Sequence, residues 1–99
     1  MAQFRTEGAT LHVVGDLDAK DLDEFEHACD QLVESTAEPE LLLDFSEVEY
    51  MASVHIGVLM SFRHRITETG RRFRLRPSRT IRALLEMTGA NESLLLTDD

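Results

Sequence analysis

Residues 41–59 read LLLDFSEVEYMASVHIGVL, which combines an apolar run, a short acidic turn and the start of an amphipathic segment. The apolar run at residues 41–45 is typical of a central strand covered on both faces. The helix predicted to follow begins near Ser53, and serine is a favoured capping residue, so its hydroxyl is expected to cap this helix. The unpaired N–H groups and the dipole of a helix start favour a negative group in such a loop. We therefore expect the junction between strand and helix to be the functional part of the chain.

The segments on either side of this junction alternate between strand and helix patterns. Strands are predicted at residues 3–5, 10–17, 41–45, 72–76 and 94–96, and helices at residues 19–35, 54–69 and 79–88. Ser78 is a predicted cap for the third helix, and Gly70 and Gly89 are predicted helix stops. This order predicts one α/β domain over residues 1–99, with a four- to five-stranded mixed sheet and three to four helices mainly on one face.

Helical spacing predicts which side of each long helix faces the core. In the first helix the apolar positions are Leu22, Phe25, Ala28, Cys29, Leu32 and Val33, opposite an acidic face. In the second helix they are Val54, Val58, Leu59, Phe62 and Ile66. Arginines at positions 72, 74 and 76 alternate with apolar residues, which predicts a solvated strand face.

The formal charge of −9 over 99 residues is unevenly distributed. Residues 1–55 hold 14 Asp and Glu against two basic residues, whereas residues 56–99 hold 5 against 8 arginines. The acidic first half argues against nucleic-acid binding, which needs a cationic surface. No apolar run approaches the roughly 20 residues that cross a bilayer, so no membrane insertion is expected. A single cysteine and the lack of a signal-like N-terminus favour a cytoplasmic protein.

The sequence contains no constellation of residues that is typical of catalysis. Three of the four histidines, His12, His27 and His64, are predicted to be solvated, and no metal-ligand spacing occurs. Cys29 falls on the core side of the first helix, where it is expected to be a small buried apolar residue. Asp16 and Asp18 form a carboxylate pair, but an Asp beside a helix start is more often a cap. We therefore expect neither enzymatic activity, nor a metal, nor a cofactor.

Four short motifs occur in order along the chain: GDLD at residues 15–18, DFSEVEYM at 44–51, IGVL at 56–59 and MTG at 87–89. Together they resemble the STAS domain family, which includes the bacterial anti-sigma factor antagonists, over essentially the whole chain. The resemblance implies a STAS-like fold and a non-enzymatic domain that regulates a protein partner by binding it.

The departures from the family pattern fall in the loop that carries the family's phosphorylation switch. Where the family typically reads Asp-Ser-Ser-Gly-Leu-Gly, this chain has ASVHIG at residues 52–57. By this resemblance Val54 replaces the phosphoacceptor, and valine has no hydroxyl to accept phosphate. Ser53 is left as a possible phosphoacceptor one residue earlier, although capping is expected to engage its hydroxyl.

The resemblance places the partner-binding surface on this loop and on the helix that follows. The residues concerned are Met51, Ser53, Val54, His55, Ile56 and Gly57, with Asp16 and Asp18 in the neighbouring loop. The implied partner is an anti-sigma factor with a histidine-kinase-like ATPase domain. Two alternatives remain: a STAS subunit of a lipid-transporting ABC system, bound to the ATPase subunit and needing no phosphoacceptor, and a small-molecule-binding STAS module.

Overall fold

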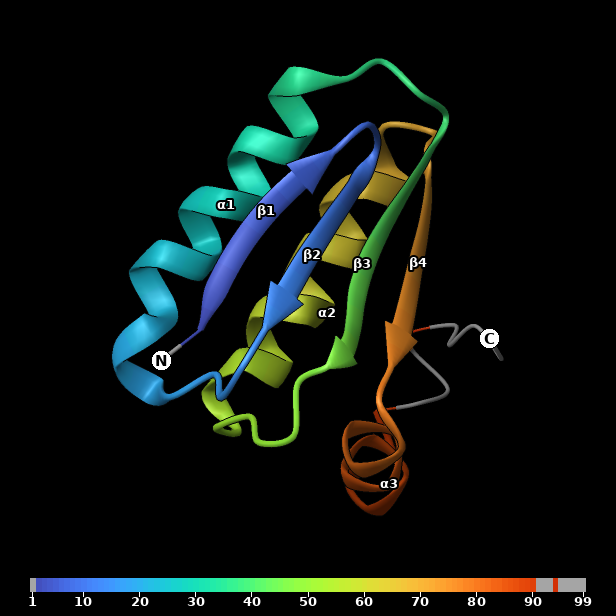
Figure 1. Ribbon diagram of the computed structural model, residues 1–99. Helices are drawn as coiled ribbons and strands as arrows, with labels where there is room; N and C mark the ends of the chain where they lie inside the picture. Colours follow the sequence, from blue (N-terminus) through green and yellow to red (C-terminus); the bar gives the residue numbers. More distant parts are fainter. Residues whose placement is uncertain (1, 91–93, 95–99) are drawn as a thin grey trace.

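The computed structural model describes residues 2–90 and residue 94. Within these residues four strands form one mixed sheet in the order β1-β2-β3-β4 (Figure 1). The elements in chain order are β1 (Gln3–Glu7), β2 (Thr10–Val14), the 3-10 turn η1 (Ala19–Asp21), α1 (Leu22–Ser35), β3 (Glu40–Glu47), α2 (Val54–Glu68), β4 (Arg72–Pro77) and α3 (Arg79–Thr88). β1 and β2 pair antiparallel through a tight turn in which Gly8 has a φ of +60°, whereas β2, β3 and β4 are parallel. Parallel neighbours need crossover connections, and α1 and α2 provide them.

Both crossover helices cover the same face of the sheet, and α3 lies beyond the end of β4 (Figure 1). The predicted mixed sheet with helices mainly on one face is therefore confirmed. The predicted cap and stop of the third helix are also present. The Ser78 hydroxyl accepts a hydrogen bond from the backbone N–H of Ile81 at 3.1 Å, and Gly89 ends α3 with a φ of +78°.

The hydrophobic core lies between the sheet and the two crossover helices. Alternate strand residues point into it, as the two-residue period of a strand requires. Phe25 of α1 is fully buried at its centre, with its ring 5.8 Å from that of Phe45 and 6.1 Å from that of Phe4. The buried apolar residues of the strands are Leu11, Val13, Leu41, Leu43, Phe45, Phe73 and Leu75.

Two strand predictions differ from the structure. The run at residues 41–45 is central but not covered on both faces: Leu42 and Asp44 are only half-buried, because no described helix lies over that side of the sheet. The strand predicted at residues 10–17 ends at Val14, because the pairing register shifts there and Gly15 has a φ of +95°. Of the strand predicted at residues 94–96, residues 95 and 96 lie outside the described residues, and Leu94 is helical.

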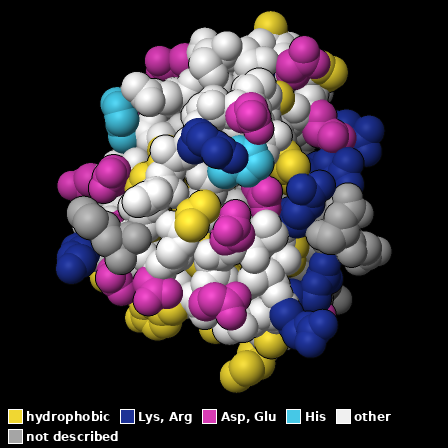
Figure 2. All heavy atoms as spheres, in the orientation of Figure 1, with side chains coloured by type: hydrophobic (Ala, Val, Ile, Leu, Met, Phe, Trp, Pro, Cys, Tyr) yellow, Lys and Arg dark blue, Asp and Glu magenta, His cyan; other side chains and the backbone are white. Residues whose placement is uncertain are grey.

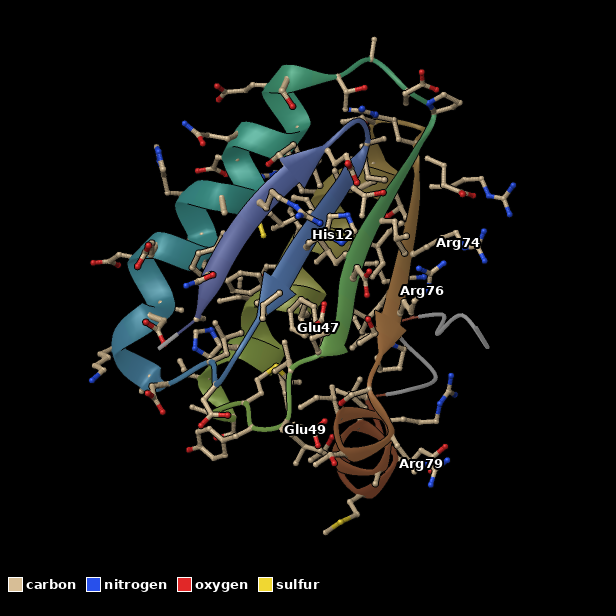
Figure 3. All side chains as sticks on the ribbon, in the orientation of Figure 1. His12, Glu47, Glu49, Arg74, Arg76 and Arg79 are labelled. Carbon is tan, nitrogen blue, oxygen red and sulfur yellow. The ribbon has the colours of Figure 1, made fainter. Side chains whose placement is uncertain are left out.

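The open face of the sheet carries charged side chains that pair across the strands (Figures 2 and 3). The strand register aligns His12, Asp44 and Arg76 in one row. His12 Nδ1 lies 3.1 Å from Asp44 Oδ2, and Arg76 Nη1 lies 3.8 Å from the same oxygen. In a neighbouring pair, Arg74 Nη1 lies 3.3 Å from Glu40 Oε1. Arg72 and Arg74 are exposed, as predicted, whereas His12 and Arg76 are only half-exposed. The sequence did not predict the cross-strand pairs that these side chains form.

Asp44 is the central group of this row. Burial by itself would raise the pKa of its carboxyl, but hydrogen bonds from Ser46 and the neighbouring His12 and Arg76 outweigh burial and lower the pKa below its ordinary value. The backbone N–H of Ser46 donates to Asp44 Oδ1 at 3.0 Å. The ionised carboxylate therefore stabilises the arrangement of β2, β3 and β4.

We expect Asp44→Asn to lower the free energy of unfolding by about 1 kcal/mol near pH 7, because His12 and Arg76 lose their charged partner. The pKa of Asp44 is lower in the folded chain, so its contribution is present above about pH 4 and is lost as the pH falls through the folded pKa. Urea unfolding near pH 7 and near pH 3 measures the free energy of unfolding of the wild type and of Asp44→Asn. The difference between the two proteins should become smaller at the lower pH. Glu47→Gln, the same charge change at an exposed position at the end of β3, is the control. An equal difference in the free energy of unfolding at both pH values would contradict a stabilising role of the ionised Asp44 carboxylate.

Candidate protein-docking site

Two loops leave the same end of the sheet and continue side by side beyond the strands. These are the β2–α1 loop and the β3–α2 loop, at the carboxyl ends of neighbouring parallel strands. The Gly15 N–H donates to the Glu47 carbonyl at 3.1 Å, the Leu17 N–H to the Tyr50 carbonyl at 2.9 Å, and the Ala52 N–H to the Leu17 carbonyl at 2.9 Å. The two loops are therefore held to each other by backbone pairing, as if the strands continued.

His55 connects the same two loops from within the core. Its side chain is fully buried, and its Nε2–H donates to the backbone carbonyl of Asp18 at 2.7 Å. Its ring contacts Phe25 edge-on with 5.5 Å between the ring centroids. The other ring nitrogen, Nδ1, is buried with no hydrogen-bond partner in the described part of the chain. The first turn of α2 is thus fixed to the start of η1 by one part-buried hydrogen bond.

The six residues predicted to bind a partner separate into two groups. Met51 and His55 are buried, with 4% and 0% of their surface exposed, so their side chains form the framework of the loop and offer no contact surface. Ser53, Val54 and Gly57 are exposed, and Ile56 is half-buried. Val54 exposes 44% of its surface at the first position of α2. The surface available to a partner is therefore centred on Val54.

The side-chain cap predicted at Ser53 is absent, whereas Asp18 occupies the N-cap position of η1 in a capping box with Asp21. Ser53 occupies the N-cap position of α2, but its backbone is helical, with φ −61° and ψ −22°, and its hydroxyl makes no capping bond. In the neighbouring loop Asp16 is exposed and Asp18 precedes η1. In this capping box the Asp21 carboxylate accepts from the Asp18 N–H at 2.8 Å.

The buried side of α2 also differs from the predicted stripe. The residues that face the core are His55, Leu59, Phe62 and Ile66. Their spacing of four, three and four residues is that of a helix face, so this signal was present in the sequence. A stripe chosen by hydrophobicity alone selects Val54 in place of His55, because histidine counts as polar. The exchange exposes an apolar side chain beside the paired loops.

A groove between α1 and α2 begins at Val54. It has a volume of about 600 Å³, and its apolar lining comes from Leu22 and Cys29 of α1 and from Val54, Val58 and Phe62 of α2. Charged side chains line it as well: Glu26 and Asp30 on α1, and Arg65 on α2, with Asp30 and Arg65 paired at 2.8 Å.

The chemistry of the groove is that of a binding surface. Burial raises the pKa of the Cys29 thiol to about 12, so the groove offers no thiolate nucleophile near neutral pH. Among residues 2–90 and 94, no three His, Cys, Asp or Glu side chains come together as metal ligands. The helices of that same part of the chain are all too short or too polar to cross a membrane.

The fold and the paired loops define a class of small α/β domains with a four-stranded mixed sheet and helices on one face. The chain belongs to the STAS domain family, since a family model described as "Mlab, STAS domain" matches residues 1–97. No curated protein matches the chain at a significant level.

Several solved structures share the fold. An anti-sigma factor antagonist from Mycobacterium paratuberculosis is 20% identical with a TM-score of 0.82, and the alignment covers 100% of this chain and 86% of that chain. The anti-sigma factor antagonist SpoIIAA in its unphosphorylated form is 16% identical with a TM-score of 0.74, covering 100% and 90%. The Bacillus cell fate determinant SpoIIAA in its phosphorylated form is 16% identical with a TM-score of 0.67, covering 100% and 93%. At these identities the likeness shows the fold alone.

We expect His55→Ala to lower the free energy of unfolding by about 2–4 kcal/mol, because it leaves a cavity beside Phe25 and removes the donor to the Asp18 carbonyl. Urea unfolding followed by circular dichroism measures the change. His27→Ala on the exposed side of α1 is the matched control and should change stability by less than about 0.5 kcal/mol. Equal effects of the two substitutions would show that His55 does not hold the loops together.

Proposed function

We propose that the chain is a non-enzymatic protein-interaction module that regulates a partner in the manner of an anti-sigma factor antagonist. The observation that carries the proposal is the exposed Val54 at the start of α2, supported by paired loops whose framework is buried. Open α/β folds usually place their binding sites outside the carboxyl ends of the parallel strands, which is where these loops lie.

The loop that leads to Val54 and the groove beside Val54 together have the composition of a transient interface. The side chain is apolar and opens onto the apolar lining of the groove. Glu47 and Glu49 are exposed at the end of β3 and in the following loop (Figure 3), and Tyr50 exposes 52% of its surface. An apolar centre with an aromatic residue and a charged rim is common in protein–protein interfaces. The acidic rim and the net charge of −9 disfavour nucleic acid as the partner.

Val54 also bears on how binding is regulated. A phosphate group adds about −1.5 to −2 charge and can disrupt a fitted interface, but valine has no oxygen to carry it. By the family resemblance, the module stays in its binding-competent form at this position. We infer a cytoplasmic partner of the histidine-kinase-like ATPase type that leaves residue 54 unmodified.

A second candidate follows from the same side chain. A STAS subunit of a lipid-transporting ABC system binds its ATPase subunit and needs no phosphoacceptor, so an apolar residue at position 54 favours this function as well. In both candidates the burial of Val54 adds to affinity, by about 25 cal/mol for each Å² of apolar surface removed from water. The two differ in the partner, a kinase-type ATPase or an ABC ATPase.

We expect Val54→Asp to abolish partner binding without unfolding the chain, because it places an uncompensated charge at the centre of the interface but on the protein surface. Affinity capture from extract of the native cells, followed by mass spectrometry, measures retention and identifies the ATPase. Met87→Asp is the control, since Met87 exposes 85% of its surface on α3. A partner retained equally by wild type and Val54→Asp would place the docking surface elsewhere.

Incubation with the captured ATPase and ATP should leave position 54 unmodified and should place little phosphate on Ser53. Successive helical residues point about 100° apart, so a kinase aligned on position 54 does not meet the Ser53 hydroxyl. Intact-mass and peptide mass spectrometry measure the phosphate, with Ser53→Ala as the control. Stoichiometric phosphate on Ser53 would show that the acceptor has moved by one residue and that the module is switchable.

A further inference from the structure

The groove between α1 and α2 has a shape that suits the binding of another helix. It is open to solvent, holds about 600 Å³ and runs between two neighbouring helices. Both walls of the groove are helices, whose backbone groups are engaged in their own hydrogen bonds. The groove therefore offers side chains to a ligand, but no free backbone groups with which an extended segment could pair. An extended segment lying there would leave its backbone groups unpaired, whereas a helix satisfies its own. The geometry therefore favours a helical occupant.

The charge of the groove selects the kind of helix. α1 carries five acidic residues and no Lys or Arg along its 14 residues. Glu26 lines the groove, and Asp23 lies three residues before it on the same helix. On the opposite wall Arg65 is already paired with Asp30. An occupant with an apolar ridge therefore gains from Lys or Arg on the flank that faces α1.

Gly57 gives independent support. It lies in the groove wall, on the second turn of α2, where glycine weakens a helix. Its φ is not positive, and a Cβ at this position would meet nothing within 4 Å, so neither the backbone conformation nor internal packing requires glycine there. The missing side chain leaves room for a second backbone to approach α2 closely.

We propose that the partner docks by inserting an amphipathic helix, with an apolar ridge and a basic flank, into the groove between α1 and α2. This inference rests on the proposed docking at Val54, which forms one end of the same groove. It adds the chemistry of the element that the partner supplies: apolar residues at positions i, i+3, i+4 and i+7, with Lys or Arg beside them.

The test uses the whole chain and three synthetic peptides of about 18 residues. One has a leucine ridge with lysine flanks, the second has the same ridge with glutamate flanks, and the third has the first peptide's composition in scrambled order. Isothermal titration calorimetry should show that the lysine peptide binds at least about tenfold more tightly than either of the others. The scrambled peptide controls for general attraction to an acidic protein.

Two pairs of variants locate the binding. Gly57→Leu should fill the groove and weaken binding of the lysine peptide at least about tenfold. It should also raise the melting temperature, because leucine is a better helix former than glycine. Its control is Thr67→Leu, which adds an exposed leucine to α2 outside the groove lining. Glu26→Lys should weaken binding of the lysine peptide and strengthen binding of the glutamate peptide. Its control, Glu24→Lys, makes the same charge change on α1 away from the groove.

Three results would overturn the inference: no measurable binding of the lysine peptide, equal binding of the ridged and scrambled peptides, or no effect of Gly57→Leu. Self-association of the chain that Gly57→Leu abolishes would assign the groove to a second copy and would overturn it too. The response of native partner capture to Val54→Asp reports separately on the proposed function, because that response does not depend on the shape of the partner.

Discussion

The backbone pairing of the β2–α1 and β3–α2 loops is the constraint on which the rest of the site depends. Leu17 and Met51 form an isolated parallel bridge beyond the ends of β2 and β3, and both side chains are buried. Parallel strands are far apart in the chain, so nothing local keeps the loops at their ends together. Here three backbone hydrogen bonds and the His55–Asp18 contact do so. These contacts thereby hold the first turn of α2 in a fixed position relative to the two loops.

A buried framework beneath an exposed contact surface suits a domain that acts by binding. Loops that order only on binding lose conformational entropy at that moment, whereas a pre-organised surface does not. Met51 and His55 lie under the surface, and Val54 stands on it. A substitution below the surface should act on stability and one on the surface should act on binding.

The strand register redistributes the charge that is visible in the sequence. The first half of the chain is strongly acidic, but the carboxylates of β3 lie beside arginines of β4: Glu40 next to Arg74, and Asp44 next to Arg76. These pairs balance acid and base on the open face of the sheet. Two acidic residues of α1, Glu26 and Asp30, line the groove on the opposite side of the domain. Pairing across the sheet therefore sets which acidic side chains are left without a basic neighbour, and this could not be read from either half of the sequence.

The sequence by itself determined the order of the helices and strands through residue 88, the helix bounds to within a few residues and the position of the junction between β3 and α2. Those properties follow from local periodicity, capping residues and glycines such as Gly89, which act within a few residues of one another. Only the tertiary structure decided that His55 is buried while Val54 is exposed. The partner of His55 is the Asp18 carbonyl, 37 residues away, and the groove exists only where two separate helices meet. Contacts between distant segments decide which face of a helix is covered, and no local pattern contains that information.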